Sequence, residues 1–266
     1  MQINLIQISA LLTLVPPSLL LLRREIKKDF LFSAVIFVSV CGALLQVYVQ
    51  QSAGWNIGFS AALWLTILAC LVIYIILIFV TKEGWRLNPV LFPYLFLFGL
   101  LAMIWNQGPE KQFFVNIPMA WIGTHVVVSL ATYGLLTLAA LAGFAAMLQE
   151  RAIKNKIRTR LTRQLPSVVS SEKILVNLLI ACVIVLSIGL LTGVASLYIT
   201  TGYFLVFNHK IILVFIVFVI VLFILFVHFN TGIRGRAAMR FILFAYLSLT
   251  LAYPGVKFVK DVLLSS

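Results

Sequence analysis

The chain has 266 residues, of which 63% are hydrophobic and only 10% charged, and its mean hydropathy is +1.13. A soluble globular domain is usually about half apolar and about a quarter charged, so this composition leaves too little polar surface for a soluble protein. Disordered chains are poor in the apolar residues that dominate here, which excludes disorder as well. The composition therefore predicts an all-α polytopic membrane protein, with residues 1–266 forming a single integral membrane domain.

Eight apolar stretches follow one another along the chain, and each is long enough to cross about 30 Å of hydrocarbon as a helix. The first stretch has no basic segment before it and no small-residue cleavage site after it, so we expect a retained span rather than a signal peptide. About eight transmembrane helices are therefore predicted. They cover residues 3–22, 30–50, 57–80, 87–105, 122–148, 174–197, 211–227 and 241–259.

The net charge of +13 comes from 20 basic and 7 acidic residues. In a soluble protein this balance would suggest nucleic acid, but in a membrane protein basic residues mark cytoplasmic loops and contact anionic lipid. Sixteen of the 20 lie in the loops after the first, third, fifth and seventh spans, and the other four lie in the remaining loops and the tail. This asymmetry predicts that both termini face the outer (periplasmic) side. It also predicts lipid contacts and no nucleic-acid partner.

Two local patterns inside the spans predict helix geometry. Pro16 and Pro17 lie within the first span and should kink it, because proline lacks the N–H that a helix interior needs. Gly189 and Gly193 form a small-xxx-small pair in the sixth span, which favours the close approach of a neighbouring helix.

Few side chains remain that could carry chemistry. No carboxylate lies in the middle of a span, although ion-coupled transport normally needs an ionisable group at depth. No hydrolase or phosphate-binding motif is present, so the chain is not expected to be an enzyme. Three scattered cysteines without a CxxC pair predict neither a disulfide framework nor a zinc site. These cysteines are Cys41, Cys70 and Cys182.

The three histidines are the remaining candidates. In the predicted topology His125 lies near the outer end of the fifth span and His209 at the outer entry of the seventh. His228 ends the seventh span at the inner face, near Arg234 and Arg236. Two histidines make a poor zinc site without further ligands, but they are a complete axial pair for haem iron. The alternative is that each is a polar group at the level of the lipid headgroups.

The surroundings of these histidines fit a flat apolar ligand. Aromatic residues precede both outer histidines, and an aromatic belt at the membrane interface explains them equally well. They are Phe113, Phe114, Trp121, Tyr203, Phe204 and Phe207. His125, Ser129, Thr132 and Leu136 share one helical stripe that should face the bundle interior. We expect Ser129 to hydrogen-bond an imidazole nitrogen of His125 and so to orient the ring.

The later part of the chain resembles the cytochrome c assembly family, which contains CcsA- and CcmC-type haem-handling membrane proteins and a shorter YpjD-like branch. THVVVSLATYGLLTLAALAGFAAMLQER, at 124–151, is similar to the family's haem-ligand span. LPSVVSSEKILVNLLIACVIVLSIGLLTG, at 165–193, is similar to the segment that follows it. NHKIIL and HFNTGIRGRAA resemble the next span and its cytoplasmic end. The resemblance covers residues 125–266 well, and residues 1–120 match mainly by their pattern of spans.

The resemblance implies haem handling at the outer face of the bacterial inner membrane, during attachment of haem to apocytochrome c. The implied cofactor is a non-covalent, b-type haem, and the implied partners are apocytochrome c or other maturation proteins. His125 matches the external histidine that opens the equivalent family span. His228 falls where larger members have a histidine within the membrane, and Arg234 or Arg236 would pair with haem propionates there.

The chain also departs from the larger members of the family. The 198–209 segment has no tryptophan where those members carry a WWD motif, and residues 254–266 contain no histidine. His209 therefore corresponds to the family's second external histidine in its predicted place on the outer face, but the two do not align in sequence. These departures favour an accessory haem-binding role over a complete synthase. The alternatives are a small-molecule permease and a structural subunit of a membrane complex, neither of which would bind haem.

Overall fold

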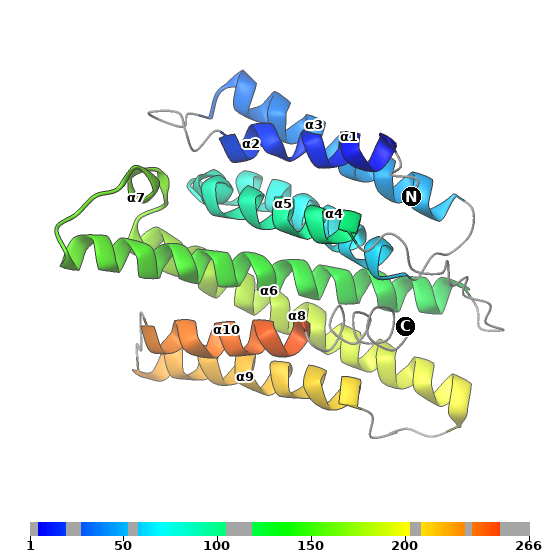
Figure 1. Cartoon of the computed structure of the whole chain (residues 1–266). Coiled ribbons are helices and arrows are strands. Elements are labelled where there is room, and N and C mark those ends of the chain that lie inside the picture. The colour runs from blue at the N-terminus through cyan, green and yellow to red at the C-terminus, as the bar shows by residue number, and fades with distance from the viewer. Residues whose placement is uncertain are drawn as a thin grey trace.

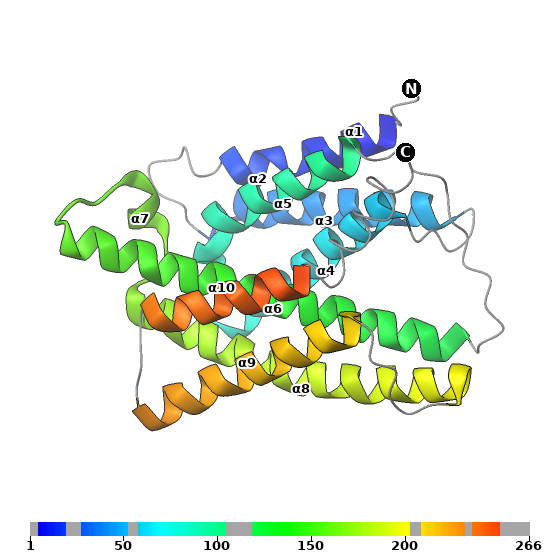
Figure 2. The same ribbon diagram turned by 60° about the horizontal axis from the view of Figure 1, so that its bottom comes forward.

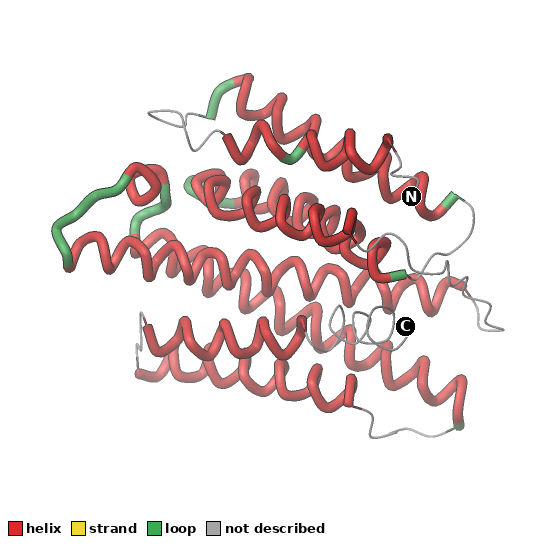
Figure 3. Tube along the Cα trace, in the orientation of Figure 1, coloured by secondary structure: helices red, strands yellow, loops and turns green. Residues whose placement is uncertain are grey.

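The computed structural model describes residues 5–19, 28–52, 58–104, 119–202, 209–231 and 236–250. Every regular element within them is a helix, as the composition predicted (Figure 3). The helices are α1 (Leu5–Thr13), α2 (Val15–Leu19), α3 (Phe30–Gln51), α4 (Phe59–Val80), the 3-10 turn η2 (Gly84–Leu87), α5 (Asn88–Ile104), α6 (Met119–Lys154), α7 (Arg160–Gln164), α8 (Val168–Thr201), α9 (His209–Thr231) and α10 (Arg236–Thr250).

Six helical segments of the described chain are long and apolar enough to cross a membrane. They coincide with the second to seventh predicted spans, and the protein is a multi-pass membrane protein. Two shorter apolar helices, Leu5–Leu19 and Phe241–Thr250, occupy parts of the first and eighth predicted spans. The rest of those two spans lies outside the described residues.

The two longest helices are longer than the apolar patterns predicted. α6 has 36 residues and α8 has 34. At 1.5 Å per residue they measure roughly 54 and 51 Å, well beyond about 30 Å of hydrocarbon. The prediction ended the fifth span at Leu148 because polar residues follow, but the helix continues through them to Lys154.

α6 is the central helix of the bundle (Figure 1). On one side it packs against α8 and α10, and with α9 these helices form a closed ring in which α6 and α9 occupy opposite corners. On its other side it packs against α4 and α5, which carry α1, α2 and α3 (Figure 2). A Cβ atom at Gly134 would lie 2.6 Å from the side chain of Ile73, so a glycine here lets α4 lie close to α6.

The helix ends that flank the most basic connections lie at one end of the bundle. α7 and the turn between α4 and α5 are at this end, and the end of α2, the start of α3, the end of α9 and the start of α10 lie there too (Figures 1 and 2). We call it the α7 end. This grouping agrees with the sequence, in which loops rich in basic residues alternate with loops that have few.

The predicted kink in the first span is confirmed as a break between α1 and α2. Pro17 has no N–H to offer the carbonyl of Thr13, which would be its partner in an unbroken helix. The hydroxyl of Ser39, on α3, donates to that carbonyl instead, at 2.7 Å. The amide of Asn88 donates to the carbonyl of Pro17 at 3.0 Å. Both carbonyls thus have partners inside the protein, as a low-dielectric environment requires.

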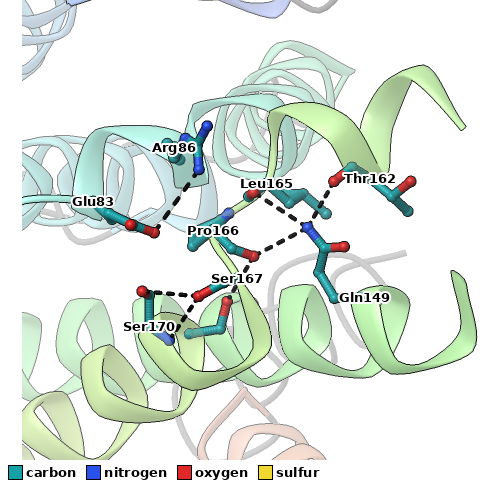
Figure 4. A network of polar contacts seen from close by, with 9 residues as sticks. Glu83, Arg86, Gln149, Thr162, Leu165, Pro166, Ser167 and Ser170 are labelled. Carbon is teal, nitrogen blue, oxygen red and sulfur yellow. Dashed lines mark hydrogen bonds and ion pairs between the residues drawn. The ribbon is translucent and has the colours of Figure 1, made fainter. Parts of the chain in front are cut away.

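The connection from α6 to α8 is held by one side chain (Figure 4). The side-chain amide of Gln149 donates to the backbone carbonyls of Thr162 at 2.6 Å, Pro166 at 3.1 Å and Leu165 at 3.2 Å. The hydroxyl of Ser167 then accepts from the N–H of Ser170 at 3.2 Å and caps α8. Gln149 therefore fixes the direction in which the chain enters α8.

Replacing Gln149 by glutamate tests this arrangement. The new carboxylate would face three carbonyl oxygens with no hydrogen to donate, and we expect a loss of about 2 kcal/mol in stability. Thermal unfolding in detergent and protease cleavage within residues 155–167 measure the effect. Glu150→Gln, which changes charge at the next position, should leave both measurements unchanged. Equal behaviour of the two variants would contradict the assigned role of Gln149.

Candidate functional site

His125 lies in the second turn of α6, at the end of the bundle opposite α7, and its side chain is half-buried. The imidazole lies against α8. Its Nδ1 atom is 3.2 Å from Oγ1 of Thr192. A Cβ atom at Gly193 would be 3.1 Å from Cε1 of the ring, closer than most side chains tolerate. The ring therefore occupies space that exists because residue 193 is glycine.

The small-residue pair of α8 forms the close helix contact that the sequence predicted, and the partner helix is α6. A Cβ atom at Gly189 would meet the Val128 side chain at 3.3 Å, one helical turn from the contact between Gly193 and His125. Small residues at this spacing let two helices approach closely. Within lipid there is no hydrophobic driving force between helices, so such close packing drives their association. The structure adds that one of the two small positions receives an imidazole.

The hydrogen bonds of Thr192 favour one tautomer of His125. The Thr192 hydroxyl donates within α8 to the carbonyl of Ile188, at 2.9 Å. Because its hydrogen is used in this way, Oγ1 is available to accept one from Nδ1 of His125. The tautomer with hydrogen on Nδ1 leaves a lone pair on Nε2, which is the form of imidazole that binds a metal ion.

The predicted hydrogen bond from Ser129 to the imidazole is wrong. The Ser129 hydroxyl donates to the backbone carbonyl of His125 at 2.7 Å. A serine within an apolar helix commonly turns back to the carbonyl four residues earlier, because its surroundings offer few other acceptors. The orientation of the stripe was predicted correctly, since Thr132 and Leu136 are buried.

Thr192 is the polar contact that the sequence analysis missed. It is separated from His125 by 67 positions and belongs to another span. Its only signal in the sequence is its place directly before Gly193, on the face that the small-residue pair marks for helix packing.

The other predicted site residues lie in two places. His209 is the first residue of α9, which begins on the same side as α6 and is set back from the end of α8 (Figures 1 and 2). His228 lies in the last turn of α9, half-buried, with its ring centroid 5.5 Å from that of Phe229. Nineteen residues of helix separate it from His209, or roughly 28 Å. Arg236 opens α10, and Arg234 lies outside the described residues.

A second polar group, unmarked in the sequence, joins α5, α6 and α10. The hydroxyl of Tyr246 is hydrogen-bonded to that of Tyr94 and lies 3.1 Å from that of Tyr133. Tyr133 also contacts Oγ1 of Thr250 at 3.3 Å, and Thr250 donates to the carbonyl of Tyr246 at 2.8 Å. These contacts attach α10 to the helices on both sides of the bundle, so they hold the ring that contains α6 and α9 in place.

Tyr246→Phe removes the hydroxyl shared by two partners. We expect a loss of about 1 to 3 kcal/mol in stability, because it leaves buried hydroxyl groups with fewer partners. Thermal unfolding of the purified protein measures it. The matched control is Tyr48→Phe, at a tyrosine that is 72% exposed, and it should unfold like the unaltered protein. A Tyr246 variant as stable as this control would show that the cluster does not hold α10.

Comparison with known proteins identifies the family. The model described as Cytochrome C assembly protein matches residues 29–264. The chain belongs to this family. An uncharacterized 28.8 kDa protein from the nifR3-like 5' region of Azospirillum brasilense is 44% identical over 233 residues, covering 88% of this chain and 86% of that protein. The inner membrane protein YpjD of Escherichia coli K12 is 23% identical over 265 residues, covering 97% of each. No solved structure matches the chain.

The match is wider than the resemblance in the sequence motifs. It begins near the start of α3 and includes α3, α4 and α5, which resembled the family only in their pattern of spans. The matched region therefore includes helices from both sides of α6.

Proposed function

We propose that this protein is a haem-binding protein of the bacterial inner membrane that assists cytochrome c assembly. One observation carries the proposal most directly. In a chain of the cytochrome c assembly family, His125 is held against Gly193 with its Nδ1 atom 3.2 Å from Thr192 Oγ1. This arrangement presents Nε2 as a ligand for iron.

The residues present fit a non-covalent, b-type haem. An imidazole nitrogen is a suitable axial ligand, and the porphyrin supplies the four equatorial ones. The chain has no CxxCH motif through which haem would be attached covalently. Bound haem would supply an iron centre and a porphyrin for delivery. The protein's part is to orient the imidazole through Thr192 and to surround the ligand with apolar helices.

His209 is proposed as the second axial ligand. α6 and α9 stand at opposite corners of the ring formed with α8 and α10, so a ligand in the ring would lie between them. His209 opens α9 on the side of the bundle where α6 begins (Figure 1). A flat ligand at this end would then be held by one histidine from each of two helices that do not pack closely together.

The proposed orientation places the α7 end in the cytoplasm and the His125 end outside. It follows from the positive-inside rule, since 16 of the 20 basic residues lie in the connections at the α7 end. With eight spans in a single membrane domain, both termini are then outside. Haem bound by His125 would be accessible from the side on which apocytochrome c receives haem.

An accessory role fits this chain better than a complete synthase. The segment between α8 and α9 is short and lacks tryptophan, so it offers no large external platform for haem. His228 would contact haem only at the α7 end, with Arg234 or Arg236 beside the propionates. The proposed partners are haem, lipid, and apocytochrome c or another maturation protein. A permease or a structural subunit without haem remains the competing function.

Histidine variants test the ligand assignment. The protein purified from haem-supplied cells should show the absorption spectrum of a low-spin, bis-histidine haem. His125→Ala and His209→Ala should each lose most of this haem, whereas His228→Ala, at the other end of α9, should keep it. Haem content measured by the pyridine haemochrome method decides between the outcomes. Equal haem in the wild type and the His125 variant would reject His125 as a ligand.

Thr192→Val tests whether the threonine orients the imidazole. Valine has nearly the same shape but removes the acceptor of the Nδ1 hydrogen, and loss of such a contact typically lowers metal affinity about 10- to 100-fold. Haem titration of the purified protein measures the affinity. Thr132→Val is the matched control, because Thr132 is a buried threonine whose hydroxyl donates to a carbonyl of its own helix. If both variants bind haem equally well, Thr192 has no orienting role.

A further inference from the structure

A cavity of about 430 Å³ lies at the α7 end, at the opposite end of the bundle from His125. It is formed between the turn after α4 and the first turns of α8. Lys82 and Lys173 line it, together with the polar side chains of Ser170 and Asn177. Its volume falls within the range of about 300 to 1,000 Å³ that is usual for ligand pockets. Nothing in the proposed haem site uses these residues.

The charge in this cavity is positive. Both lysines are exposed, and within the described part of the chain neither has an ion-pair partner. Glu83 also lines the cavity, but its Oε2 atom is directed to Nη1 of Arg86 at 3.9 Å (Figure 4). Arg86 therefore offsets the carboxylate, and the two ammonium groups are left to attract an anion.

The polar groups that accompany the lysines include hydrogen-bond donors. The Ser170 hydroxyl accepts a hydrogen bond from Ser167 at 3.0 Å, which leaves its own hydrogen available to the cavity. The amide of Asn177 adds two hydrogens. Two ammonium groups, a hydroxyl and an amide match an anion with several acceptor oxygens. Phosphate is the common biological group of this kind.

The surface beside the cavity points to a lipid as the source of that phosphate. Val80 lines the cavity and is 75% exposed, and its neighbour Phe79 is 81% exposed. Val169, one residue before Ser170, is 73% exposed. Large apolar side chains so exposed in a membrane protein face acyl chains. The cavity thus lies where the hydrocarbon-facing surface meets the polar surface, at the level of lipid headgroups.

We propose that this cavity binds the headgroup phosphate of an anionic phospholipid, with Lys82 and Lys173 as its two cationic contacts. The acyl chains would lie along the exposed end of α4 and the start of α8. A lipid held there would join the turn after α4 to α8, and so would connect the two groups of helices at this end.

Lipid retention by the full-length protein tests the proposal. Native mass spectrometry in detergent would count bound phosphatidylglycerol and phosphatidylcholine in separate titrations, with inorganic phosphate as a third ligand. The wild type should retain phosphatidylglycerol in preference to phosphatidylcholine. Lys82→Gln with Lys173→Gln should weaken phosphatidylglycerol binding about tenfold or more. The control pair Lys154→Gln with Arg158→Gln removes the same charge from the same end of the protein and should change binding less than twofold.

A third variant separates the cavity from its charge. Asn177→Trp keeps both lysines but fills the space, and it should weaken phosphatidylglycerol binding while the thermal unfolding midpoint stays near that of the wild type. Equal losses in the two double variants would show a diffuse charge effect and overturn the proposal. Unchanged binding in Asn177→Trp would also overturn it. Equal retention of phosphatidylcholine, or displacement of lipid by inorganic phosphate at millimolar concentration, would reject an anionic lipid as the ligand.

Discussion

The close packing of α6 against α8 is the contact on which the rest of this structure depends. α6 packs more extensively against both groups of helices than any other described helix, and α8 is its most extensive contact. Gly189 and Gly193 permit the approach, because a Cβ atom at either position would press on a side chain of α6. The same approach brings Thr192 to within 3.2 Å of His125. Structural stability and the candidate ligand site therefore rest on the same pair of helices.

The scarcity of polar side chains makes their partners informative. In a low-dielectric environment an unpaired polar group is costly, and several of the polar side chains that the chain retains are tied to specific backbone groups. Ser39 and Asn88 satisfy carbonyls at the proline break of the first span, and Gln149 satisfies those of the connection into α8. Thr192 differs from these residues because its partner is the imidazole of His125, whose ring has a second nitrogen, Nε2, that could bind a ligand. That difference supports the proposed ligand role of the imidazole, whereas the other contacts complete the backbone's hydrogen bonds.

The features that could be predicted from the sequence are those set within one helix. Apolar length predicted the six long spans, Pro16 and Pro17 predicted the break between α1 and α2, and helical periodicity predicted which face of α6 is buried. The contacts that define the site join different helices, and a single sequence carries no signal for them. Thr192 and Tyr246 were missed for this reason. Ser129 was assigned to the imidazole of His125 because these two residues lie on one helix. The ligand roles of His125, His209 and His228 and the roles of Arg234 and Arg236 stay predictions, and the side chains of His209, Arg234 and Arg236 lie outside the described part of the chain.

The haem spectrum of Gly193→Ala beside Gly189→Ala tests the central claim most directly. Both variants add one methyl group to the same face of α8, one turn apart, but only the first meets the imidazole of His125. The account predicts that the wild type and Gly189→Ala bind haem with the same spectrum, and that Gly193→Ala loses haem or its low-spin ligation. Identical haem binding by all three proteins, or none by any of them, would contradict it.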